Sequence, residues 1–190
     1  PELQALIDGV LAYNLRQRDL WLSKQAGPTL FSAGDDLGTQ HALPMSPAQW
    51  RRYLKPCYAA IYGPLRKAGH DVYMHTDGHI YEIIPDLVDC GVNVVNPQVR
   101  ANGLENLARV CKKLVCVDLD LDRQLFPFAT PSQIDEHVRE AVETLGSPEG
   151  GLWLKAEVDD GVPLENVEAI CAALEKHRLH YSKRGRPQAV

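Results

Sequence analysis

Long apolar runs are missing from this sequence of 190 residues. A helix that spans a bilayer needs about 20 consecutive apolar residues, and the sequence shows neither such a run nor a basic-then-apolar leader. We therefore expect a cytoplasmic protein that makes no membrane contact.

Cysteine is sparse as well. The chain has five cysteines, an odd number, and no two of them form a C-x-x-C pair. This count and spacing argue against the disulfide framework of a small secreted protein. We expect reduced thiols that mostly fill the core.

Two further absences narrow the choice of ligands. The formal net charge is −5 and no basic stripe is present, which argues against nucleic acid as a partner. No strand is followed by a dinucleotide fingerprint or a phosphate loop, because the Gly34-x-x-x-Gly38 segment lacks both a third glycine and a following Lys-Ser/Thr. We expect no nucleotide cofactor.

What the sequence does contain is a repeated alternation of strand and helix. Strands are predicted at 29–33, 71–74, 92–95, 114–117 and 151–154, and helices at 2–25, 46–69 with a break at its prolines, 80–90, 104–112, from 130 onward and 164–177. Parallel strands need crossover helices of this kind, so the pattern predicts an α/β fold, either an open doubly wound sheet or a (β/α)8 TIM barrel.

Polar residues gather where these strands end. Both architectures bind ligands at the carboxyl ends of their strands. We take as candidates for catalysis His75, Asp77 and Asp36, and for substrate binding Asp35, Gln40, His79, Asn96, Gln98, Asp118 and Asp120.

The segment Tyr73-Met74-His75-Thr76-Asp77-Gly78-His79 is the strongest candidate. If the strand continues through Asp77, the side chains of His75 and Asp77 share one face, about 6.5–7 Å apart. They could then bind one ion or one substrate group, or Asp77 could orient His75 as a general base. The alternative is that they only close a turn between a strand and a helix.

Several segments, in this order, resemble the uroporphyrinogen decarboxylase (URO-D) superfamily over nearly the whole chain: GDDLGTQ, SPAQWRRYLKPCY, HTDGH, IPDLVDCGVNVVNPQ, ATPSQIDEHVREAV, GGLWL and PLENVEAI. That superfamily contains the decarboxylase of haem biosynthesis and zinc-dependent methyltransferases that use a corrinoid carrier or a thiol. The resemblance implies a (β/α)8 barrel of which this chain is the C-terminal part, with about five βα units over residues 1–178, followed by a basic tail over residues 179–190.

The resemblance also implies a metal site with altered ligands. The methyltransferases bind zinc through a His-x-Cys-Gly segment, which here is His75-Thr76-Asp77-Gly78, and through a later cysteine whose place falls near Glu157. A set of His75, Asp77 and Glu157 favours zinc or a harder divalent ion. The histidine that follows the last strand in the decarboxylase is not matched, because Ala156 stands near its position.

These observations leave three functions open. The first is a metal-assisted methyltransferase that acts on a small methylated compound with a corrinoid protein or a thiol as partner. The second is a decarboxylase of uroporphyrinogen, a tetrapyrrole. The third is a non-catalytic binding or assembly module, whose exposed sheet edges would be covered by another chain or in a homodimer.

Overall fold

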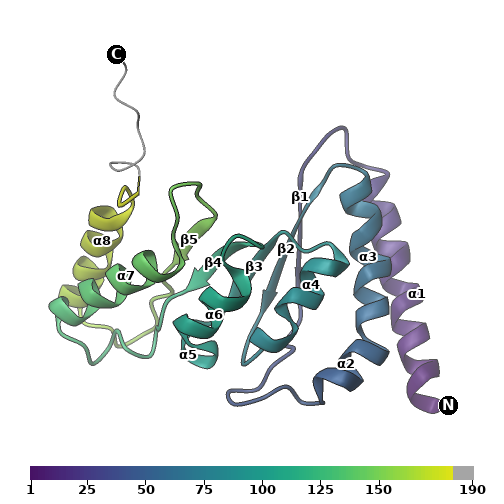
Figure 1. Cartoon of the computed structure of the whole chain (residues 1–190), viewed down its shortest axis with the longest axis horizontal. Helices are drawn as coiled ribbons and strands as arrows, with labels where there is room; N and C mark the ends of the chain where they lie inside the picture. The colour runs from purple at the N-terminus through teal and green to yellow at the C-terminus, as the bar shows by residue number, and fades with distance from the viewer. Residues whose placement is uncertain (182–190) are drawn as a thin grey trace. The chain divides into compact units, whose positions relative to one another are not determined.

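The computed structural model describes residues 1–181, in which five strands form one sheet in the order β1-β2-β3-β4-β5 (Figure 1). The strands are β1 (Leu30–Gly34), β2 (Asp71–Thr76), β3 (Val94–Pro97), β4 (Cys116–Asp120) and β5 (Leu152–Lys155). The pairs β1–β2 and β4–β5 are parallel. The predicted strands and their alternation with helices are thereby confirmed.

The strands extend further toward their carboxyl ends than predicted. His75, Asn96, Asp118 and Asp120 lie inside strands and not in the loops that follow. The physical reason is that a parallel ladder is held by backbone groups, which pair regardless of how polar the side chain is. Hydrophobic patterning alone therefore ends such a strand too early.

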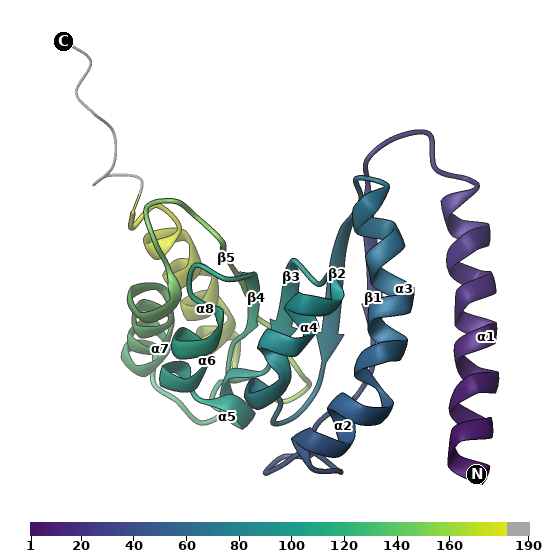
Figure 2. The same ribbon diagram turned by 45° about the vertical axis from the view of Figure 1, so that its right-hand side comes forward.

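The chain divides into two compact units, residues 1–95 and the residues from 96 onward, with the boundary inside β3. The first unit contains α1 (Glu2–Leu22), α2 (Pro47–Tyr53), α3 (Lys55–Lys67), a short 3-10 helix η1 (Tyr81–Ile83) and α4 (Ile84–Cys90). Helix α3 packs against β2 and α4, and Figure 2 shows it between β1 and α1. The predicted single domain over residues 1–178 stays a prediction.

The helix starts follow local sequence rules. Ser46 caps α2 and forms a capping box with Gln49, as its serine–proline–glutamine spacing predicts. The predicted break falls at Leu54, between α2 and α3, and Pro56 then lies in the first turn of α3, where its missing N–H costs nothing. The helix predicted at 80–90 begins as the 3-10 turn η1 and becomes α-helical only at Ile84.

The core of the first unit lies between β2 and its helices. Its largest fully buried side chains are Trp50, Leu65, Met74, Ile80, Ile83, Ile84 and Leu87. Helix α1 contributes no buried residue; it is held by an edge-to-face contact between Trp21 and Phe31 and by a hydrogen bond from Arg18 to the Ala60 carbonyl of α3.

The second unit contains α5 (Val99–Asn102), α6 (Leu104–Cys111), α7 (Pro131–Leu145) and α8 (Leu164–His177). Thr130 and Gln133 form the capping box that opens α7. Helix α7 packs against α6 and α8. No helix within residues 1–181 has the length and apolarity to cross a bilayer. Of the predicted basic tail, residues 182–190 lie outside the described residues.

Candidate active site

Two loops of the first unit are tied together at the carboxyl ends of β1 and β2. One loop follows β1 and the other follows β2. Four hydrogen bonds join the loop after β1 to the end of β2 and the loop that follows it: Asp35 N to His75 O (3.1 Å), Leu37 N to Thr76 Oγ1 (3.1 Å), Gly38 N to Asp77 O (3.2 Å) and His79 N to Thr39 O (2.7 Å). These bonds fix the position of Asp36 relative to the end of β2.

Glycine at positions 38 and 78 lets the loops approach this closely. Gly78 has φ +81°, and a Cβ built on it would lie 2.3 Å from the carbonyl carbon and oxygen of Gly38. A Cβ on Gly38 would lie 2.5 Å from the backbone nitrogen of His79. Any other residue at either position would force the backbones apart.

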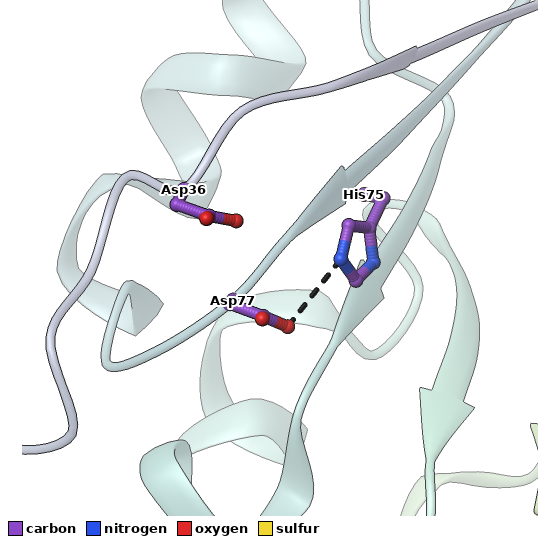
Figure 3. Close-up of side chains that lie close together, drawn as sticks. All are labelled: Asp36, His75 and Asp77. Carbon is purple, nitrogen blue, oxygen red and sulfur yellow. Dashed lines mark ion pairs between the residues drawn. The ribbon is translucent and has the colours of Figure 1, made fainter. Parts of the chain in front are cut away.

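The result is a cluster of three side chains, Asp36, His75 and Asp77 (Figure 3). Each offers one ligand atom, and these atoms lie within 4.8 Å of one another. His75 Nε2 is 3.3 Å from Asp77 Oδ1, so the predicted proximity of this pair is confirmed. The His75 and Asp77 side chains are 35 % and 40 % exposed, which leaves the cluster accessible to a ligand.

The donor set fits a divalent cation. Two carboxylates and one imidazole could each supply one ligand and leave other coordination positions for substrate or water. A ligand set without a thiolate is less selective for zinc than a set that contains one. It also accommodates harder ions such as Mn²⁺. The assignment of these residues as metal ligands stays a prediction.

Glu157, the third predicted ligand, lies in the second unit, after β5, where its carboxylate forms an ion pair with Arg123. Its part in the ligand set stays a prediction. Within the first unit, the structure brings together the predicted ligands His75 and Asp77 and adds Asp36, a candidate for catalysis.

The other candidates of the first unit make mostly local contacts. The Asp35 carboxylate accepts a hydrogen bond of 2.7 Å from the Tyr58 hydroxyl of α3. Burial, together with this bond, raises the pKa of Tyr58, which therefore keeps its proton. The ring of His79 meets Tyr81 edge to face at 4.9 Å, and Gln40 is exposed.

In the second unit, the predicted residues lie along β3 and β4. Asn96 donates a 2.6 Å hydrogen bond to the Asp118 carbonyl, and Gln98 forms a β-bridge with Asp120. Asp120 is 7 % exposed, and Lys155 of β5 places its Nζ 3.5 Å from Asp120 Oδ1.

Sequence reasoning missed Tyr58 and Lys155. Tyr58 lies far from Asp35 in sequence, inside a helix, and nothing in its local pattern points to the loop. Lys155 had a usable signal: it directly follows the predicted strand 151–154, and period-two alternation places it on the same face as Trp153.

Comparisons with known proteins bear on the fold and the family of the chain. Among solved structures, a dihydropteroate synthetase with its product superposes with a TM-score of 0.50 at 20% identity, covering 89% of this chain and 63% of that chain. The YdjI aldolase from Escherichia coli K12 gives a TM-score of 0.40 at 18% identity, covering 90% and 57%. No curated protein sequence matches the chain.

The dihydropteroate synthetase supports the fold alone, which is of the (β/α)8-barrel type with five βα units in this chain. The chain spans less than two thirds of the length of both solved structures. A family model described as uroporphyrinogen decarboxylase (URO-D) matches residues 25–177, a range that includes all five strands and the cluster at His75. On this match over most of its length, the chain belongs to the uroporphyrinogen decarboxylase family.

Proposed function

We propose that this chain is part of a metal-assisted enzyme that removes a methyl group from a small methylated compound and passes it to a corrinoid protein or a thiol. The observation that carries the proposal is the cluster of Asp36, His75 and Asp77, whose ligand atoms lie within 4.8 Å of one another. Its place at the carboxyl ends of β1 and β2 is the edge where barrels of this type bind substrates.

Each group in the proposed site has a distinct role. Asp36, His75 and Asp77 would hold the ion from one side, and their partial exposure leaves the other side to the substrate. A bound divalent ion supplies Lewis-acid polarisation of the substrate heteroatom. In the transfer itself, the bond between the heteroatom and the methyl carbon would break with its electron pair staying on the heteroatom, and the corrinoid or thiolate acceptor would supply the electron pair of the new bond to the methyl group.

Decarboxylation of a tetrapyrrole is the second candidate, and the description of the matching family favours it. In that case no metal is needed. Asp77 would orient the His75 imidazole, 3.3 Å away, and the aspartates would carry the proton that replaces the lost carboxylate.

A binding or assembly module is the third candidate. It is favoured by the two edge strands, β1 and β5, and by the apolar side chains that α1 exposes, Leu3, Leu6, Val10, Tyr13 and Leu20. A homodimer or another chain that covers them would bury apolar surface and pair the open edges.

Metal titration tests the first function. Calorimetry with Zn²⁺ and Mn²⁺ on the 190-residue chain should show one site per chain. His75→Ala and Asp36→Ala should each weaken binding by about tenfold or more, because each removes one of three ligands.

Glu157→Gln is the matched control. It distinguishes a metal site formed by Asp36, His75 and Asp77 from the site predicted by sequence, in which Glu157 is the third ligand. Unchanged binding in Glu157→Gln supports the Asp36 set, whereas lost binding restores Glu157 as a ligand. A chain that binds neither ion, yet binds a porphyrinogen tightly, would favour the decarboxylase. A chain that binds neither and dimerises would favour the module.

A further inference from the structure

The second unit presents a separate group of side chains on one face of β4 and β5. Residues in register on these parallel strands are Asp118 with Trp153, and Asp120 with Lys155. Leu152 and Leu154 point to the helix side, where they line a cavity together with Val142 of α7 and Leu174 of α8. Since side chains alternate along a strand, Trp153 and Lys155 project from the opposite face, as do their partners on β4.

Asp120 is an exceptional member of this group. It is 7 % exposed, and its Oδ1 atom is buried without a hydrogen-bond partner among the described residues. The nearest cation is Lys155, whose Nζ lies 3.5 Å from Oδ1, an ion pair too long for a good hydrogen bond. A buried hydrogen-bond acceptor without a partner destabilises the folded protein. Such an atom in a native structure therefore calls for an explanation, and binding of a ligand is one.

Lys155 supplies the positive charge beside the Asp120 carboxylate. Its side chain is 43 % exposed, and an ammonium group has three donors, so most of its hydrogen-bonding capacity stays available beyond the contact with Asp120. The neighbouring arginines are more closely engaged: Arg100 pairs with Asp122 at 2.8 Å, and Arg123 pairs with Glu157. Trp153, 51 % exposed, adds an apolar wall two residues before Lys155 on the same face.

We propose that Lys155 and Asp120 form a binding site for a small carboxylate that carries a hydroxyl group on the neighbouring carbon. The ammonium group of Lys155 moves off Asp120 to bind the ligand carboxylate, which opens the buried Asp120 Oδ1 to the hydrogen bond of the ligand hydroxyl group. Trp153 covers the apolar side of the ligand. All three residues belong to the second unit. The proposal therefore goes beyond the metal-assisted function and does not depend on whether the first unit binds a metal.

Glycolate and acetate are the probes, because they differ in the hydroxyl group that Asp120 is expected to recognise. Binding to the full chain is followed by NMR through the indole N–H resonance of Trp153, assigned with Trp153→Phe. Glycolate should shift this resonance saturably and bind at least about threefold more tightly than acetate, since one additional hydrogen bond to a charged group is made. This selectivity tests the proposal in the unmodified protein.

Variants assign the two halves of the site. Lys155→Met should weaken glycolate binding by about tenfold or more, and Lys155→Arg should retain it. Asp120→Leu, of similar volume and without an acceptor, should leave glycolate and acetate with equal affinity. Lys113→Met, an exposed lysine just before β4 at its opposite end, is the control and should change nothing.

The proposal is overturned if neither probe gives a saturable shift, if wild-type chain binds both probes equally, or if Lys155→Met binds glycolate as wild type does. Urea unfolding of each variant verifies that it is folded. Metal binding by the first unit should be the same in Lys155→Met and wild type, which keeps this site distinguishable from the cluster at His75.

Discussion

Gly38 and Gly78 meet backbone to backbone, so closely that a Cβ on Gly78 would lie 2.3 Å from the Gly38 carbonyl. This contact joins the loop after β1 to the loop after β2. It places Asp36 beside His75 and Asp77, which belong to a different strand and its exit. The geometry of the cluster of Asp36, His75 and Asp77 therefore depends on two residues that bear no side chain.

Gly78→Ala should be strongly destabilising. Alanine at φ +81° is strained, and its methyl group would clash with the Gly38 backbone, so we expect the free energy of unfolding to fall by about 2–4 kcal/mol. Urea unfolding measures this, and Mn²⁺ titration should show weaker binding because the two loops separate.

Gly63→Ala is the control for that experiment. Gly63 lies inside α3 of the same unit, and a Cβ added there would meet no atom within 4 Å. Alanine at this position should raise the free energy of unfolding by about 0.5–1 kcal/mol, because glycine is a poor helix former. Equal effects of the two substitutions would show that the contact between the loops is not the cause.

Acidification should loosen the loop after β4 through His137. The Nε2 atom of His137 accepts a 3.1 Å hydrogen bond from the Asp122 backbone N–H. Burial lowers the pKa of His137 and outweighs the opposing charges of Asp122 and Glu140. The folded protein thus binds this proton less readily than the unfolded chain, and stability should fall as the pH drops below the ordinary histidine pKa of about 6.5.

Urea unfolding at pH 7.5 and pH 5.0 checks this prediction. His137→Gln has no group that titrates in this range, so its free energy of unfolding should change less between the two pH values than that of the wild type. His41→Gln removes an exposed histidine and should keep the wild-type difference. Identical pH dependence in wild type and His137→Gln would contradict the prediction.

Asp86→Asn should weaken the attachment of α4 to α2 and α3. Asp86 is 8 % exposed and accepts hydrogen bonds from Arg51 (2.8 Å) and Lys55 (2.7 Å). Burial alone would raise the pKa of Asp86, but the hydrogen bonds and charges of Lys55 and Arg51 together lower it. Loss of this carboxylate should cost about 1–3 kcal/mol, since both cations lose a charge-assisted bond.

The control is Asp89→Asn. Asp89 also binds Lys55 at 2.8 Å, yet its side chain is 68 % exposed, and an exposed ion pair contributes less than about 1 kcal/mol. Thermal or urea unfolding should therefore separate the two variants. The effect of Asp86 should also vanish in acid below the ordinary aspartate pKa of about 3.9, because its lowered pKa stabilises the folded state only above that range. An Asp86→Asn variant no less stable than Asp89→Asn would contradict the prediction that Asp86 attaches α4 to α2 and α3.

Local sequence was sufficient for the order of strands and helices. The capping boxes at Ser46 and Thr130 predict helix starts because they depend on residues only three positions apart. The closeness of His75 and Asp77 could also be predicted, because the two residues are only two positions apart, although β2 ends at Thr76 and does not continue through Asp77.

Contacts between segments that lie far apart in the sequence could not be predicted from local patterns. Asp36 was not singled out by the sequence as a neighbour of His75 and Asp77, because hydrogen bonds across two chain segments and the contact of Gly38 with Gly78 bring it to the end of β2. Lys155 gained its significance only from the register of β5 on β4, which places it opposite the buried carboxylate of Asp120. Sequence by itself thus determined the elements and the edge of the sheet at which polar residues gather. Tertiary structure decided which of those side chains meet, because register and loop contacts join residues that no local pattern connects.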